Sequence, residues 1–119
     1  MIEPQLHAKS IGEWRDWLEA YHADESEIWL VFYKKKTGKQ VFAYNEAVEE
    51  ALCFGWVDSV ERGIDEERYA LRFTPRKKKS NWSESNKKRV AKLIAEGKMR
   101  EAGLRAIEEP KENGIWVEE

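Results

Sequence analysis

The spacing of hydrophobic residues along the chain predicts helices that alternate with short strands. Apolar side chains recur at helical intervals over residues 11–21, over 46–54 and from about 84 to 96. A fourth, weaker helix is expected at about 100–112, where Gly103 and Pro110 interrupt the pattern. Ser10 and Glu13 have the spacing of a capping box, and Gly55 and Gly97 stand where helices typically end. The third helix has its cap at Ser80, Asn81 or Ser83.

Four further segments are expected to form β-strands. The clearest strand is predicted from Glu27 to Lys35, where the run IWLVFY is β-branched and aromatic on both faces and suits a strand covered on both sides. Residues 40–43 are expected to pair back as a short strand. Residues 56–62 and 68–74 are predicted to form a hairpin with a loop at 63–67. In the second arm the residue types alternate, so one face meets the core and the other meets water or a ligand. The alternating sets are Tyr69, Leu71 and Phe73 against Arg68, Ala70, Arg72 and Thr74.

These elements predict an α+β fold with a small, mostly antiparallel sheet and four packed helices. A chain of 119 residues is expected to form one domain, residues 1–119, with a loose start at residues 1–9. The first residues do not have the basic and then apolar regions of a signal peptide. The single cysteine, Cys53, would be a free thiol, which fits the reducing cytoplasm. No apolar run is long enough to insert into a membrane.

Charge is distributed unevenly along the chain. The net charge is −2, but residues 68–92 hold ten lysines and arginines against a single acid, Glu84. Such asymmetry points to an anionic partner, either nucleic acid or a phosphorylated small molecule. The alternative is that these residues bind no ligand and form a solvated charged rim, with Trp82 packed inward. The expected anion face consists of Arg62, Arg68, Arg72, Arg76, Lys77, Lys78, Lys79 and Trp82.

Candidate catalytic residues are few, and we assign none. Cys53 lies at the carboxyl end of a predicted helix, where the helix dipole does not activate a thiol, so it is interpreted as a small buried hydrophobe. Asp58 is interpreted as a turn-forming or ion-paired residue. In the alternative, the protein is a small enzyme, with Asp58 in a pocket walled by Trp56 and Trp82 and with Arg72 as an anion clamp.

The spacing of ligand-type residues favours neither a metal site nor a nucleotide cofactor. The two histidines, His7 and His22, are far apart, and there is no CxxC pair, Walker loop or GxGxxG turn. We therefore expect no metal and no cofactor.

Nearly the whole chain resembles the YdeI/OmpD-associated family, also called bacteriocin-protection proteins. The resemblance lies in the segments WRDWLEAYH, EIWLVFYKK, EAVEEALCFGWVDS, RYALRFTPR and SNWS, followed by AGL. It implies a small α+β protein of poorly defined biochemistry, associated with resistance to antimicrobial peptides, for which no catalytic residues are established. It also adds Asn86 to the candidate site, because Asn86 matches a polar signature position.

Three hypotheses therefore stand. The first is a binding module with a basic face. The second is an interaction protein that contacts another protein or an identical chain through its acidic remainder and exposed aromatic residues. The third is the small enzyme around Asp58.

Overall fold

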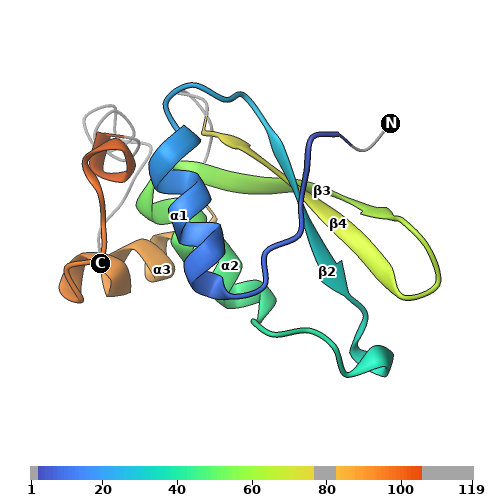
Figure 1. Ribbon diagram of the computed structural model, residues 1–119. Coiled ribbons are helices and arrows are strands. Elements are labelled where there is room, and N and C mark those ends of the chain that lie inside the picture. Colours follow the sequence, from blue (N-terminus) through green and yellow to red (C-terminus); the bar gives the residue numbers. More distant parts are fainter. Residues whose placement is uncertain (1–2, 77–82, 106–119) are drawn as a thin grey trace.

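The computed structural model describes residues 3–76 and 83–105, which form one sheet with a layer of helices against it (Figure 1). Residues 101–105 are also helical. The named elements, in chain order, are β1 (Gln5–Leu6), α1 (Ile11–Tyr21), β2 (Ile28–Tyr33), the 3₁₀ turn η1 (Lys35–Thr37), α2 (Tyr44–Cys53), β3 (Trp56–Gly63), β4 (Arg68–Pro75) and α3 (Glu84–Ala95).

The helices begin and end where local chemistry satisfies their backbone. The Ser10 hydroxyl accepts a hydrogen bond from the Glu13 amide at 3.1 Å, and the Ser83 hydroxyl accepts one from the Asn86 amide at 3.1 Å. Gly55 and Gly97 follow α2 and α3 with φ of 77° and 70°, a left-handed conformation that favours glycine. The predicted bounds of these three helices are thus nearly correct.

The four strands are arranged in the order β1-β2-β4-β3. β4 pairs antiparallel with both β2 and β3, whereas β1 pairs parallel with β2. The α+β class is therefore confirmed, but the sheet is mixed rather than mostly antiparallel. The difference comes from β1, which lies in the segment that the sequence pattern assigned to a loose start. A two-residue parallel strand has no hydrophobic period of its own to reveal it.

The core lies between the sheet and the helices. Phe73 of β4 and Trp56 of β3 are almost fully buried there with Trp14 of α1 and Leu52 of α2. The rings of Trp14 and Phe73 lie 5.0 Å apart, and Trp17 stacks on Trp14 at 5.8 Å. We call this side of the sheet the helix-covered face.

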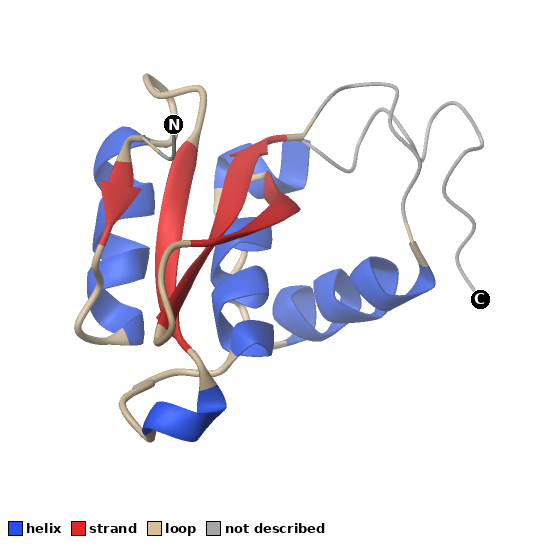
Figure 2. Cartoon of the chain, turned by 90° about the vertical axis from the view of Figure 1, so that its right-hand side faces the viewer, coloured by secondary structure: helices blue, strands red, loops and turns tan. Residues whose placement is uncertain are grey.

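The opposite side of the sheet carries no helix among the described residues, and we call it the helix-free face. Figure 2 shows the strands in front of the helices. Trp29, Val31 and Ala70 lie on this face, because their neighbours in the strands belong to the core cluster and side chains alternate along a strand.

Two local expectations are wrong. Residues 40–43 are not a strand: the Gln40 side chain accepts the Tyr33 amide at 2.7 Å and so takes the place of a strand carbonyl. α2 begins at Tyr44, not after Asn45, since the Glu46 carboxylate accepts the Ala43 amide at 2.9 Å. Of the helices in the described ranges, none is both long and apolar enough to cross a membrane.

Candidate functional site: an arginine cluster on the helix-free face

Three arginines surround Ala70 on the helix-free face. Arg68 and Arg72 lie two residues before and after Ala70 in β4, and Arg62 of β3 is its partner across the strands. In an antiparallel pair, residues diagonal to each other have Cα atoms about 7–8 Å apart, which is the spacing of Arg62 from Arg68 and from Arg72. Ala70 is 0% exposed, which fits long arginine stems lying over it. We call these three residues the arginine cluster.

Two of the three arginines have carboxylate partners. Glu27 accepts a hydrogen bond from Arg72 Nε at 3.0 Å and another from the indole of Trp29 at 3.2 Å. Asp65 accepts from both Nε and a terminal nitrogen of Arg68, at 3.0 and 2.8 Å. Hydrogen bonding to Arg68 lowers the pKa of Asp65 and in turn raises that of the guanidinium.

The third arginine is unpaired. Within residues 3–76 and 83–105, the Arg62 side chain has no hydrogen bond or ion pair, and Arg72 donates only through Nε. A guanidinium has five N–H donors in a planar fork, so this face retains several donors for a ligand.

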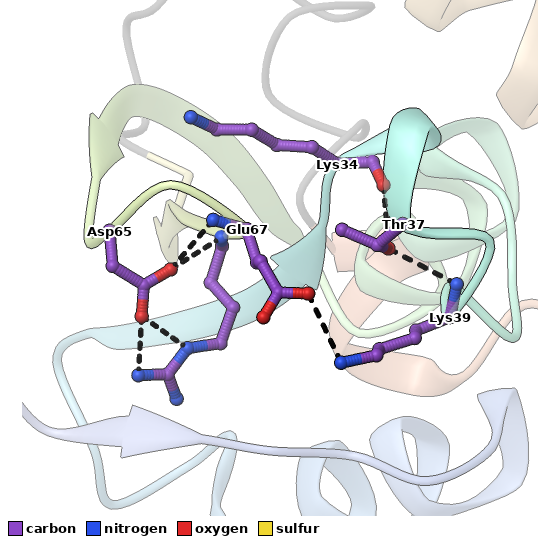
Figure 3. Close-up of polar contacts among 6 residues, drawn as sticks. Lys34, Thr37, Lys39, Asp65 and Glu67 are labelled. Carbon is purple, nitrogen blue, oxygen red and sulfur yellow. Dashed lines mark hydrogen bonds and ion pairs between the residues drawn. The ribbon is translucent and has the colours of Figure 1, made fainter.

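A lysine-rich turn lies beside the hairpin loop that carries Asp65, the partner of Arg68, and Glu67 (Figure 3). The turn comprises residues 34–39, and two contacts hold it against the loop of the hairpin. The Lys34 amide donates to the Glu67 carbonyl at 2.8 Å, and Lys39 Nζ lies 3.1 Å from the Glu67 carboxylate. Thr37 closes the turn by donating its hydroxyl to the Lys34 carbonyl at 2.8 Å. Within the described residues, the side chains of Lys34, Lys35 and Lys36 have no polar partner, and Figure 3 shows Lys34 extending away from the contacts.

A cavity of 260 Å³ lies beside this turn. Val31 and Tyr33 of β2 line it together with residues 7–9 and 39–41. Lys39 Nζ is 5.6 Å from the centre of the Tyr33 ring, so a cation stands over an aromatic face at the cavity's edge. Tyr33 is also the cross-strand partner of Arg68, which connects the cavity to the arginine cluster.

The remaining residues of the expected anion face are not shown to join it. Arg76 is half-buried at the end of β4, where its amide donates to the Gly55 carbonyl at 2.8 Å and burial lowers the pKa of its guanidinium. Asn86 is buried on α3, where its side-chain oxygen accepts from Arg89 at 2.9 Å. Lys77, Lys78, Lys79 and Trp82 lie outside the described residues.

The pocket expected around Asp58 is not assembled. Asp58 is the partner of Phe73 and lies on the helix-covered face, where it accepts the Tyr44 hydroxyl at 2.7 Å. Arg72 follows Leu71 in β4 and therefore lies on the opposite face. Trp56 is buried in the core, and its indole donates to the His22 carbonyl at 3.2 Å. Asp58 and Arg72 thus cannot act on one substrate in this structure.

The described residues offer little else that could carry chemistry. Cys53 is fully buried, and desolvation raises the pKa of its thiol to about 11, which leaves it protonated and unreactive at neutral pH. No group of three histidine, cysteine or acidic side chains within these ranges is placed to hold a metal ion.

The chain matches the model of a domain of unknown function, DUF8412, over residues 6–106. The protein belongs to this family. The resemblance to the YdeI/OmpD-associated family is therefore wrong: the matching model is a different one, and the shared-looking segments are mostly strand and helix residues of a sheet-and-helix core. No curated protein matches the chain, and no solved structure does.

The sequence pattern did not reveal the lysine-rich turn and the cavity as parts of a site. Four lysines within residues 34–39 were a visible signal, but the basic run after Arg68 was more prominent. Nothing in the sequence pattern indicated the cavity, because it forms where β2 meets residues 7–9 and 39–41, two segments about thirty residues apart in the chain.

Proposed function

We propose that the protein is a non-enzymatic binding module that holds a phosphate-bearing anion on its helix-free face. The observation that carries the proposal is the placement of Arg62, Arg68 and Arg72 at neighbouring positions around Ala70 on one face of the sheet. Nucleic acid and phosphorylated small molecules both carry the required group.

The chemistry of the cluster suits phosphate in particular. Guanidinium groups bind phosphate oxygens through paired, charge-assisted hydrogen bonds, and they lose little hydration on doing so. Arg62 and the terminal nitrogens of Arg72 have donors available without any rearrangement of the backbone.

The existing ion pairs do not block such binding. The side chains of Arg72 and Glu27 are 36% and 34% exposed, and exposed pairs of this kind contribute only about 0–1 kcal/mol. A phosphate that carries more charge than one carboxylate can displace Glu27 or Asp65, or bind beside them.

The proposal is tested by fluorescence anisotropy of labelled single-stranded and duplex oligonucleotides at low salt, with pyrophosphate as a competitor. We expect binding that weakens steeply as salt increases and that Arg62→Gln and Arg72→Gln together reduce. Lys87→Gln with Lys88→Gln on α3 is the control of equal charge change. Binding by none of these anions, or an equal loss in the control, would contradict the proposal and leave a protein partner as the alternative.

A further inference from the structure

The 260 Å³ cavity beside the lysine-rich turn has the walls of a site for a flat ring. Val31, Tyr33 and Val41 are among the residues that line it, and Val31 is buried whereas Val41 is exposed. Ligand sites are typically concave and mostly apolar, with a few polar groups that fix orientation. The volume lies slightly below the range of about 300–1,000 Å³ for drug-sized ligands, which suits a single ring system.

Two of the polar residues that line the cavity, Gln40 and Lys39, have side chains held in place by their contacts. The Gln40 amide is held at both ends, since its oxygen accepts from the Tyr33 amide at 2.7 Å and its nitrogen donates to the Phe42 carbonyl at 2.9 Å. The second N–H of that amide is left for a ligand atom. The Lys39 ammonium stands over the Tyr33 ring and is paired with the exposed carboxylate of Glu67 at 3.1 Å.

We propose that this cavity receives a nucleobase, so that the phosphates attached to it lie over Lys39 and the arginine cluster. This inference rests on the proposed function, because the phosphate-binding face supplies the other half of the site. Every nucleobase has a planar π-face that stacks on an aromatic ring such as that of Tyr33.

The extent of the basic surface favours a strand over a free nucleotide. Arg68 and Arg72 are four residues apart in β4, which corresponds to about 13 Å. The unpaired Lys34, Lys35 and Lys36 lie beyond Tyr33 and lengthen the surface further. A strand with several phosphates can contact all of these groups at once, whereas one nucleotide cannot.

A ligand series separates the two halves of the site. We expect adenosine 5′-monophosphate to bind at least about fivefold more tightly than ribose 5-phosphate, because stacking of a base contributes roughly 1–3 kcal/mol. Single-stranded oligonucleotides of about four to eight residues should bind more tightly again; equal affinity for the mononucleotide would instead identify a free nucleotide as the ligand.

A cavity-filling variant tests the location. Val41 is 63% exposed, so Val41→Phe should leave the fold intact and fill the rim. We expect it to abolish the preference for adenosine 5′-monophosphate over ribose 5-phosphate, while Ile94→Phe on α3, also at an exposed position, retains the preference.

The outcomes distinguish the two proposals. Equal binding of ribose 5-phosphate and adenosine 5′-monophosphate, or a preference that Val41→Phe leaves unchanged, would overturn the base site but not the phosphate-binding face. Failure of every phosphate ligand, including oligonucleotides, to bind at low salt would overturn both.

Discussion

Alternate residues of β4 face two different environments. Leu71 and Phe73 point toward the helices and are buried in the core, whereas Arg68 and Arg72 lie on the helix-free face and meet carboxylates at 2.8 and 3.0 Å. The first set excludes water by close packing. The second set keeps water and salt within reach, so its contacts are weak and can be exchanged for those of a ligand. One strand thereby separates what stabilises the fold from what is available for binding.

The largest effect is expected from truncating the buried side. Phe73→Ala should lower the free energy of unfolding by about 3–5 kcal/mol, because it opens a cavity beside Trp14. Arg72→Gln, at the next position along the strand, should lower it by at most about 1 kcal/mol. Urea denaturation of the two variants measures the difference, and comparable decreases would show that the two faces are not energetically distinct.

A second effect concerns the helical segment that packs against the end of α2. A Cβ placed on Gly103 would lie 2.3 Å from the Cys53 carbonyl oxygen, too close for any contact. Gly103→Ala should therefore cost about 1–3 kcal/mol of unfolding free energy. Gly12→Ala in α1 is the matched control, since its nearest neighbour is the Ser10 hydroxyl oxygen at 3.6 Å. Thermal melts should show a lowered midpoint for the first variant only; an unchanged midpoint would mean that the segment does not pack against Cys53.

A smaller effect is expected on the binding side, and it is a gain. Glu27→Gln keeps an oxygen acceptor for Trp29 and Arg72 but removes the competing negative charge. Affinity for a single-stranded oligonucleotide should rise about two- to fivefold, which corresponds to the strength of one exposed ion pair. Glu49→Gln, which removes the partner of Lys92 on α3, carries the same change of charge. Equal gains in both variants would indicate a general effect of net charge rather than release of Arg72.

The smallest effect is a dependence on alkaline pH. The pKa of Tyr44 is raised from its ordinary value of 10.0 to about 12. Desolvation is the larger cause, and the hydrogen bond to Asp58 is the second. Because the folded state disfavours ionisation, the stabilisation is complete below pH 10 and is lost as pH rises toward 12. Tyr44→Phe should flatten this fall in the free energy of unfolding, and Asp58→Asn should reduce it. A fall that is identical in Tyr44→Phe would assign it to other groups.

The alternation in β4 was readable from the sequence because period-2 patterning encodes which side of a strand is buried. The carboxyl ends of α2 and α3 were also readable, since Gly55 and Gly97 act through local backbone geometry, whereas the start of α2 was not. The sequence could not show that Asp58 and Arg72 lie on opposite faces of the sheet, because that depends on the register with β4 and on the bulge between Asp58 and Glu61.

The composition of the site was less predictable than the fold. The basic run suggested one continuous exposed surface. In the structure, Arg76 is half-buried after β4 and Asn86 is buried near the start of α3. The partner of Arg72 is Glu27, forty-five residues away, and only the pairing of β2 with β4 brings the two together. Residue types suggested an anion site, but only the tertiary structure shows which arginines lie side by side.

The most direct test of the account is the salt dependence of oligonucleotide binding with and without the arginine cluster. We would replace Arg62, Arg68 and Arg72 with glutamine and plot the logarithm of the binding constant against that of salt concentration. The slope for a single strand should become shallower by about 0.7 for each phosphate that the variant no longer neutralises, or roughly 2 for the triple variant. An unchanged slope in a folded triple variant would show that the helix-free face is not where the anion binds.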